Sequence, residues 1–383
     1  DVPIGLAGAV SKPSGYPRYT KPSLTVPADG PDLARARDAI ANAERPLMIC
    51  GVEVLHHDAA DAVSEVAHRL SIPTLTSYKA KGVIAEDDLL SLGGHGLSPK
   101  SFKLLKSLID DADVIVLAGY DPIEMRIDWR HVWQPDTEGK TVIEISAQPN
   151  RHFVHQADIS FVCDVGAGLR ALTEGLNGKP TWADGKALKM RESLKAAFPT
   201  DEVWGPAAVI DAARQAFPKH GFAAVDTGAH RILLSQQWTC YGPRTLVQST
   251  GLCTMGCAMP LAMGHKIANP DTPVIAFTGD AGMEMILGEM ATLRDMKLPV
   301  VTIVFVDESL SLIELKQRAN SQDNGGVDFG GTDFAAVAQA MGGNGVTATS
   351  REALMSAIEA GLNADTFTII ACPIGRKAYD GRF

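Results

Sequence analysis

The chain has 383 residues, of which 45% are hydrophobic and 36 are glycine, so it is long enough to form two ordinary domain cores. Its formal net charge of −10 and isoelectric point near 5.5 argue against nucleic acid or an anionic membrane as a partner. The charged residues are spread along the chain rather than gathered in a tail, which is typical of a solvated surface.

The cysteines and the apolar stretches indicate the cellular compartment in which the protein is expected. Six cysteines are scattered along the chain, and only Cys253 and Cys257 lie close together. Their spacing, without nearby histidine or cysteine partners, makes a poor zinc site, so buried thiols in a reducing compartment are the better interpretation. No apolar stretch reaches membrane-span length without interruption, and no signal peptide opens the chain. We therefore expect a cytoplasmic protein without a membrane partner.

The first half of the chain alternates helical patterns with short apolar runs. Residues 1–30 are rich in proline and are predicted to be an extended linker over a surface. Helices are expected at 32–43, 58–70 and 99–110, and strands at 46–51, 72–77, 113–119, 140–146 and 159–162. Such alternation predicts parallel strands joined by right-handed crossovers, so residues 31–178 are expected to form one doubly wound domain.

A polar, helical segment at 179–203 is predicted to connect this domain to a second alternating series, which begins at Trp204. In that series, helices are expected at 206–217, 255–268, 283–296 and from about 310, and strands at 222–226, 245–248, 273–278, 299–306 and, as a lone last strand, 367–372. Residues 204–383 should therefore form a second domain. The predicted fold class is α/β, with two doubly wound parallel sheets.

Two aspartates mark the ends of neighbouring strands in the second domain. Asp280 follows the run 273–278 within a Gly279-Asp-Ala-Gly282 turn, and Asp307 closes another apolar run 27 positions later. Because one helix-length segment joins the two runs, both carboxylates should emerge at the same edge of a parallel sheet, where such sheets bind ligands. Two hard anions beside a glycine-rich turn and a helix N-terminus suit Mg²⁺ holding a diphosphate. The alternative is a pair of solvated loop-end acids or helix caps.

This spacing resembles the signature of thiamine-diphosphate-dependent enzymes, a Gly-Asp-Gly turn followed at this interval by Asn or Asp. Residues 225–230, Val-Asp-Thr-Gly-Ala-His, are similar to the family's first diphosphate loop, and residues 249–264 to the segment that bends the cofactor. The resemblance covers nearly the whole chain. It implies the central and the diphosphate-binding domains of the family, with the N-terminal pyrimidine-binding domain absent from this chain.

Within the superfamily, the pattern is most similar to acetolactate synthase, especially the flavin-independent catabolic type. Three stretches carry that similarity: Gly119-Tyr-Asp-Pro-Ile-Glu124, Val306-Asp307 with Asp in place of the commoner Asn, and residues 326–334. This resemblance implies decarboxylation of a 2-oxo acid such as pyruvate and transfer of the two-carbon carbanion to a second carbonyl. Simple decarboxylation, or C–C lyase action on another substrate, stays open. A non-catalytic scaffold or regulatory paralogue would be expected to lack the metal ligands, yet both acids are present.

The resemblance also assigns roles to individual residues. Asp280, Asp307 and the backbone carbonyl of Ser309 would bind Mg²⁺. The residues expected to bind thiamine diphosphate are Thr227, Gly228, Ala229, His230, Cys253, Met255, Asp280, Ala281 and Gly282, with the amides of Ala281 and Gly282 facing the diphosphate. Ala281 departs from the family's usual glycine, so its turn must accept a Cβ.

Some of these residues also have purely structural interpretations. Met255 would bend the cofactor and the Cys253 carbonyl would accept a hydrogen bond from its amine, but Met255, Met259 and Met263 could equally form one buried helix stripe. His230 could bond a phosphate or only fill a strand end.

The substrate side is less defined. Leu312, Ile313 and Lys316 would face the reacting carbon, where Lys316 could attract a substrate carboxylate or stay solvated. Some relatives bind FAD in the central domain, but the loop Gly93-Gly-His-Gly96 is too weak a signal to support it, and no Gly-x-Gly-x-x-Gly turn suggests a nicotinamide cofactor.

The chain begins without Met, so we expect it to be the remainder of a longer protein or one subunit of a split one. In the family, the glutamate that generates the ylid belongs to the pyrimidine-binding domain. We therefore expect the chain to be inactive alone and to work as a dimer or tetramer together with that domain, on a small-molecule 2-oxo acid.

Overall fold

The computed structural model describes residues 3–6, 8–10, 23–126, 128–129, 132–133, 139–150 and 154–383. Much of the predicted linker at 1–30 lies outside these residues. Within the described part, Ile4–Leu6 form a short 3-10 helix, and residues 23–30 form no helix or strand, although the Thr25 carbonyl accepts a hydrogen bond of 2.9 Å from the Asp164 amide. No helix among the described residues has the length and apolar character needed to cross a membrane.

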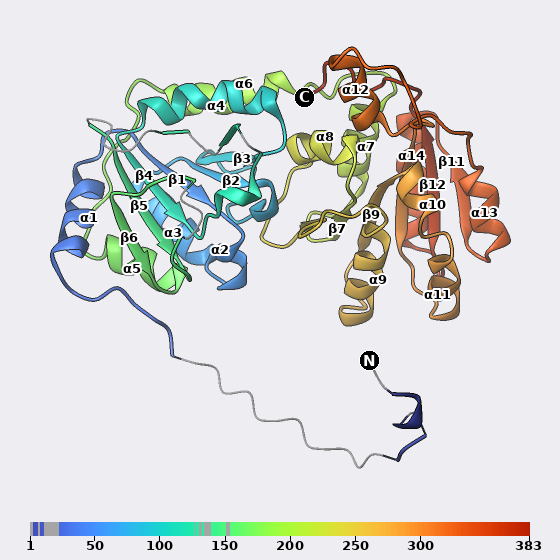
Figure 1. Cartoon of the computed structure of the whole chain (residues 1–383), viewed down its shortest axis with the longest axis horizontal. Coiled ribbons are helices and arrows are strands. Elements are labelled where there is room, and N and C mark those ends of the chain that lie inside the picture. The colour runs from blue at the N-terminus through green and yellow to red at the C-terminus, as the bar shows by residue number, and fades with distance from the viewer. Residues whose placement is uncertain are drawn as a thin grey trace.

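The described strands form two six-stranded parallel sheets, which lie side by side in Figure 1. The first sheet has the order β3-β2-β1-β4-β5-β6, and the second has the order β11-β12-β10-β9-β7-β8. The strands of the first are β1 (Pro46–Cys50), β2 (Thr74–Ser77), β3 (Ser91–His95), β4 (Val114–Ala118), β5 (Thr141–Ser146) and β6 (Ile159–Val162). Those of the second are β7 (Phe222–Val225), β8 (Leu246–Gln248), β9 (Val274–Gly279), β10 (Val301–Val306), β11 (Asn344–Thr347) and β12 (Thr368–Pro373). The predicted α/β class, with two doubly wound parallel sheets, is confirmed.

Helices cover both faces of the first sheet. One face packs against α1 (Pro31–Asn42), α3 (Ala60–Leu70) and α5 (Val165–Thr173), and the other against α4 (Pro99–Asp111) and α6 (Lys186–Ala197). The short α2 (Glu53–His56) and the 3-10 turns η2 (Tyr78–Ala80) and η3 (Pro122–Glu124) follow strand ends. Because both faces are covered, the two central strands are apolar along their whole length: every residue of β1 and β4 is buried.

The second sheet is covered in the same way. On one face lie α7 (Pro206–Ala216), α8 (Ala229–Gln237) and α14 (Arg351–Leu362), and on the other α9 (Ala258–Ala268), α11 (Glu289–Asp295) and α13 (Phe334–Ala340). Two further helices, α10 (Asp280–Glu284) and α12 (Ser311–Ala319), follow the carboxyl ends of β9 and β10. Several helices begin at a side chain that caps the first turn, as Asp333 does for α13 and Ser350 for α14.

Several predicted elements differ from the structure. The helix expected at 283–296 is divided into α10 and α11, and between them the chain makes tighter i→i+3 bonds around Gly288, a poor helix former. The helix expected from 255 begins only at Ala258. The Gly93–Gly96 stretch, interpreted as a loop, lies largely in strand β3, and the strand at the end of the chain is not alone, because β12 pairs with β10 and β11. Helices α5, α8, α13 and α14 were not predicted.

The two sheets are joined by direct contacts between their domains. Glu86 lies at this junction: its carboxylate accepts from the Cys240 amide at 2.8 Å and pairs with the buried ammonium of Lys81 at 2.6 Å. Gln248 donates across the junction to the Tyr78 carbonyl at 2.7 Å.

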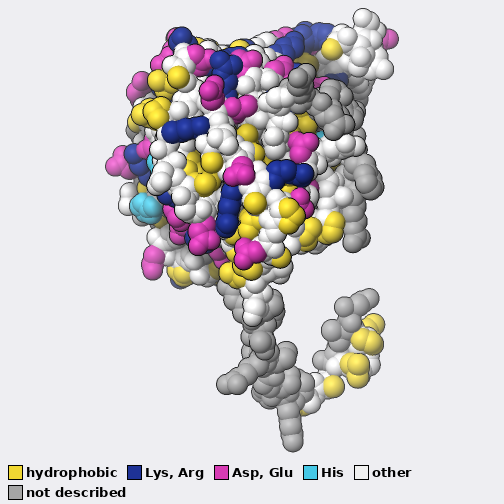
Figure 2. Space-filling model, turned by 90° about the vertical axis from the view of Figure 1, so that its left-hand side faces the viewer, with side chains coloured by type: hydrophobic (Ala, Val, Ile, Leu, Met, Phe, Trp, Pro, Cys, Tyr) yellow, Lys and Arg dark blue, Asp and Glu magenta, His cyan; other side chains and the backbone are white. Residues whose placement is uncertain are grey.

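On the face of the first domain shown in Figure 2, acidic and basic side chains are interspersed, which matches the solvated surface that the sequence predicts.

Candidate cofactor site in the second domain

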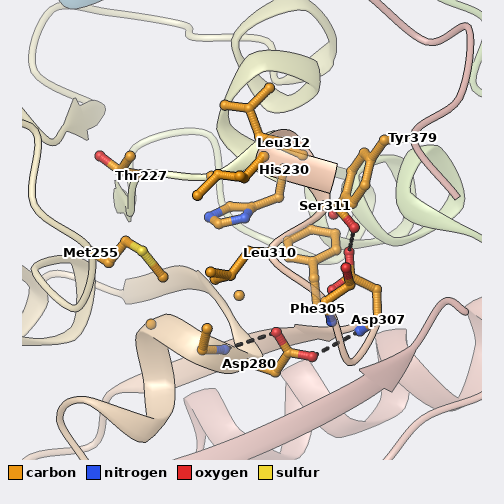
Figure 3. Close-up of a pocket in the computed structure, with 17 residues that line it drawn as sticks. Thr227, His230, Met255, Asp280, Phe305, Asp307, Leu310, Ser311, Leu312 and Tyr379 are labelled. Carbon is orange, nitrogen blue, oxygen red and sulfur yellow. Dashed lines mark hydrogen bonds between the residues drawn. The ribbon is translucent and has the colours of Figure 1, made fainter. Parts of the chain in front are cut away.

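The candidate site lies where the strand order of the second sheet reverses. From β7 the chain continues to β8 on one side and to β9 on the other, so the carboxyl ends of β7 and β9 flank the crevice in which sheets of this kind bind ligands. A cavity of about 140 Å³ opens there (Figure 3). Its lining residues are Thr227, Gly228, Ala229, His230, Met255, Gly279, Asp280, Ala281, Gly282, Phe305, Asp307, Ser309, Leu310, Ser311, Leu312, Ile313 and Tyr379.

Asp280 ties the ends of β9 and β10 together. One carboxylate oxygen accepts from the amides of Asp307 at 3.0 Å and Glu308 at 2.7 Å, and the other accepts from the amide of Ala281 at 2.8 Å. The Ala281 amide, which the sequence analysis assigned to the diphosphate, is therefore engaged by the neighbouring carboxylate in this structure. Ala281 lies in the first turn of α10 without a positive φ, which explains how the turn accepts a Cβ.

Asp307 is the second buried acid of the site. It accepts from the amide of Ser309 at 3.3 Å and from the hydroxyl of Ser311 at 2.5 Å. Burial raises the pKa of Asp307 to about 7; the Ser311 hydrogen bond opposes that rise, and the negative charge of Asp280 adds to it. Burial also raises the pKa of Asp280. Two buried acids that disfavour each other's charge are what a bound cation would stabilise.

A cation at this position would need further ligands. Among the described residues, no group of three or more His, Cys, Asp or Glu side chains could hold a metal ion. A divalent ion between Asp280 and Asp307 would take its other oxygens from a backbone carbonyl, water or an anionic ligand, which is the usual pattern for Mg²⁺ beside phosphates. The pair of acids fits a cation that arrives together with a diphosphate.

The loop after β7 supplies the opposite wall. The Thr227 hydroxyl and Nε2 of His230 are both buried without a hydrogen-bond partner. Gly228 precedes helix α8, which no side chain caps, and a Cβ at Gly228 would lie 2.5 Å from the His230 ring. Two unpartnered polar atoms beside an uncapped helix N-terminus fit a phosphate group.

The imidazole of His230 is held in place by an aromatic neighbour. Its ring stacks on Phe305 with the centroids 5.4 Å apart, and burial lowers its pKa to about 4. At neutral pH the ring is therefore uncharged, and it would contribute a hydrogen bond rather than a positive charge. The structure leaves both the phosphate-binding and the space-filling interpretations of His230 in place, since one nitrogen is free and the ring is packed.

Asp226, which the sequence analysis did not select, organises the site from beneath. This fully buried side chain accepts from the amides of Thr227 at 2.7 Å and Gly256 at 2.5 Å, and from the Thr278 hydroxyl at 3.0 Å. It thereby joins the β7 loop, the loop before α9 and the end of β9. A Cβ at Gly282 would lie 2.5 Å from an Asp226 oxygen, so Asp226 also explains why position 282 is glycine.

The structure separates Met255 from the other two methionines. Met259 and Met263 are buried in α9, whereas Met255 precedes that helix and extends into the cavity (Figure 3). The stripe interpretation therefore holds for Met259 and Met263, and Met255 is placed as a cofactor-contacting residue would be.

The remaining predicted residues divide between the cavity and its surroundings. Leu312 and Ile313 line the cavity, together with the Ser309 position, whereas Cys253 and Lys316 do not. Cys253 lies in the loop between β8 and α9, with a left-handed φ of 55°. Lys316 is exposed on α12. Besides Asp226, four residues of the cavity lining are not predicted from the sequence: Phe305, Leu310, Ser311 and Tyr379. The first three lie within four residues of Asp307 and could have been found from that position.

The fold and the site thus describe a two-domain α/β protein with a pocket whose buried acids would suit a cation and whose unpartnered polar atoms would suit a phosphorylated ligand. Comparison with known families agrees. Residues 226–372 match the thiamine pyrophosphate enzyme C-terminal TPP-binding domain, and residues 33–172 match the thiamine pyrophosphate enzyme central domain.

Several curated proteins are similar to this chain along most of its length. An acetolactate synthase of Bacillus subtilis (strain 168) is 26% identical over 370 residues, which cover 91% of this chain and 62% of that protein. An acetolactate synthase large subunit of Parasynechococcus marenigrum (strain WH8102) is 29% identical over 90% of the chain and 56% of its own length, and a catabolic acetolactate synthase of Raoultella terrigena is 24% identical over 97% and 67%. The chain therefore belongs to the thiamine-diphosphate-dependent enzymes with acetolactate synthase-like sequences, and it spans roughly three fifths of these relatives' length.

Proposed function

We propose that this protein is a thiamine-diphosphate- and Mg²⁺-dependent enzyme that decarboxylates a 2-oxo acid such as pyruvate and transfers the two-carbon unit to a second carbonyl. The observation that carries the proposal is the convergence of Asp280, Asp307, Thr227 and His230 on one cavity, which gathers two buried acids and two buried polar atoms that have no hydrogen-bond partner. The acetolactate synthases among the relatives support the choice of reaction.

In this proposal each part of the cavity has a separate task. Asp280 and Asp307, with the Ser309 carbonyl, would hold the metal ion, and the loop Thr227–His230 would bind the diphosphate. Thiamine diphosphate supplies a carbanion-stabilising ylid when bound. Met255, which lines the cavity, would contact the cofactor, and Asp226 keeps the Met255 loop and the diphosphate loop in register through its hydrogen bonds to both.

The substrate end of the cavity is apolar. Leu310, Leu312 and Ile313 form this wall, and they would exclude water from the reacting carbon. Lys316, exposed on α12, is not required for this part of the proposal. Turnover would also need the pyrimidine-binding domain, to which the family resemblance assigns the ylid-activating glutamate, and we expect a dimer or tetramer to bring that domain to this cavity.

Calorimetric titration of thiamine diphosphate in the presence and absence of Mg²⁺ tests the site. We expect Mg²⁺-dependent binding to the wild type and none to Asp280→Ala or Asp307→Ala. Asp271→Ala, which removes an exposed acid outside the cavity, is the matched control and should bind normally. Binding that persists in both cavity variants, or that ignores Mg²⁺, would contradict the assigned metal site.

The reaction itself is tested with the chain joined to, or mixed with, its pyrimidine-binding domain. We expect release of CO₂ from pyruvate together with acetolactate. Release of acetaldehyde alone would identify simple decarboxylation instead, and binding of the cofactor without turnover of any 2-oxo acid would favour a regulatory role.

A further inference from the structure

The last ten residues of the chain contribute one side chain, Tyr379, to the lining of the cavity. We call residues 374–383 the C-terminal segment. Four ion pairs fasten it: Arg376 with Asp328 at 3.2 Å and with Glu308 at 3.7 Å, Asp380 with Arg318 at 2.6 Å, and Arg382 with Glu202. The Asp380–Arg318 pair is bidentate, since the second guanidinium nitrogen reaches the other carboxylate oxygen at 2.8 Å. Such geometry holds a segment in one place better than a single-contact pair does.

Tyr379 lies between two of these ion pairs and points inward. It is 3% exposed, lines the cavity, and packs with the core cluster that contains Phe305. Figure 3 shows it near Ser311 and Asp307, whose own hydrogen bond excludes the tyrosine. The C-terminal segment therefore brings an aromatic side chain from the end of the sequence to the acids that follow β9 and β10.

The hydroxyl of Tyr379 is buried and has no hydrogen-bond partner. A buried polar group in that state is unfavourable by itself, so its presence calls for an explanation such as an absent ligand. Burial, and then the negative charges of Asp307 and Asp280, raise the pKa of Tyr379 well above its ordinary value. The group thus stays protonated and is available as a donor, and in this structure it donates to neither Asp307 nor Asp280.

We propose that Tyr379 is a further ligand-binding residue of this site, whose hydroxyl donates a hydrogen bond to an oxygen of the diphosphate. This proposal rests on the proposed function, because it needs a diphosphate between the acids and the β7 loop. The phosphate oxygens would be the acceptor that the hydroxyl lacks. The C-terminal segment would then be a positioning element, and its ion pairs would act on the ligand only through Tyr379.

The test uses inorganic pyrophosphate with Mg²⁺, a probe that needs only the diphosphate half of the site. In Tyr379→Phe the ring is kept and one hydroxyl is lost, so we expect pyrophosphate affinity to fall about 10- to 100-fold, the range for a hydrogen bond to a charged group. The thermal midpoint of the ligand-free variant should stay the same or rise, because an unpartnered buried hydroxyl is removed. A merely structural hydroxyl would give the opposite pattern, with a lower midpoint and unchanged affinity.

Two controls separate the proposals. Tyr241→Phe makes the same chemical change where the ring stacks on Arg214 and Lys219 outside the cavity, and should leave affinity unchanged. Asp280→Asn should abolish pyrophosphate binding. If it does so while Tyr379→Phe binds within twofold of wild type, the role of Tyr379 is overturned and the proposed function stands. If the wild type binds no magnesium pyrophosphate, both are overturned.

A double-mutant cycle tests the route of action. Asp380→Asn weakens the bidentate pair with Arg318 and should reduce pyrophosphate affinity several-fold in the wild-type background. In the Tyr379→Phe background the same substitution should have no effect, because its influence passes through the missing hydroxyl. Equal effects of Asp380→Asn in both backgrounds would overturn the positioning role of the C-terminal segment.

Discussion

Replacing Asp226 by Asn should disrupt the site while keeping the shape of the side chain. Its two carboxylate oxygens accept from Thr227, Gly256 and Thr278, and more weakly from the Cys257 amide at 3.4 Å. The amide group of Asn can accept through only one atom. Whichever way it is turned, its NH₂ faces at least one backbone N–H, since the Thr278 hydroxyl can rotate to accept but the backbone cannot.

The expected loss follows from these contacts. An orphaned buried N–H costs about 1–3 kcal/mol, and each lost hydrogen bond to a charged acceptor about 1.5–3 kcal/mol. With one amide orphaned and one bond weakened, we expect Asp226→Asn to lower the free energy of unfolding of this domain by about 3 kcal/mol. For a domain of this size that corresponds to a decrease of about 6–12 °C in the midpoint.

Thermal unfolding and hydrogen exchange measure the effect. Thr278→Val, which removes only the hydroxyl donor, is the matched control: it loses one hydrogen bond to a charged acceptor, about 1.5–3 kcal/mol, and leaves no backbone amide unpartnered. At least one of the Thr227 and Gly256 amides should exchange faster in Asp226→Asn than in Thr278→Val, because only the former removes an acceptor from a backbone amide. Equal midpoints and equal exchange in the two variants would refute the view that Asp226 holds the two loops together.

Two further predictions concern packing and pH. Gly282→Ala should destabilise the protein by about 1–3 kcal/mol and weaken pyrophosphate binding, because its Cβ would lie 2.5 Å from Asp226. Gly264 is helical and has open space around it, so Gly264→Ala should instead stabilise the protein by about 0.5–1 kcal/mol. Similar unfolding midpoints for the two variants would contradict the contact between position 282 and Asp226. In the central domain, burial raises the pKa of Glu124 from 4.5 to about 7 while the Val52 amide and Ser77 hydroxyl donate to it. The Glu124 carboxyl therefore loses its proton at lower pH in the unfolded chain than in the folded one. As the pH rises from 4.5 to 7, the free energy of unfolding should fall by up to about 3 kcal/mol, and above pH 7 it should level off. Glu124→Gln should flatten that dependence in urea unfolding, and parallel pH curves for the two proteins would show that another group is responsible.

The sequence predicts best where one physical cause dominates. Strands β1, β4, β9 and β10 are mostly apolar runs because helices cover both faces of their sheets, so they could be located closely. Edge strands lack that signal. Strand β11 is a partly exposed four-residue segment containing glycine, and β3 contains two adjacent glycines, so neither stands out from a loop.

The site was predictable for residues that directly follow a strand and belong to a short motif. Asp280 and Asp307 combine both properties, and the structure brings them to one cavity. Asp226 also follows a strand, but its function depends on donors from two distant segments, which no local pattern reveals. The position of Tyr379 in the cavity depends on the ion pairs of an irregular segment. Lys316 lies on the exposed side of α12 and does not line the cavity. Both positions result from tertiary packing, which no local sequence pattern reveals.

The turn after β9 shows that the two small residues following Asp280 are not equivalent. Ala281 occupies an ordinary helical position with room for its methyl group, while Gly282 meets the side chain of Asp226. Tolerance to substitution should thus differ sharply between adjacent positions. A sequence motif that requires glycine at position 281 would therefore not match chains like this one. A motif that requires glycine at position 282 together with an acid at position 226 would match them, because the acid leaves no room for a Cβ at 282.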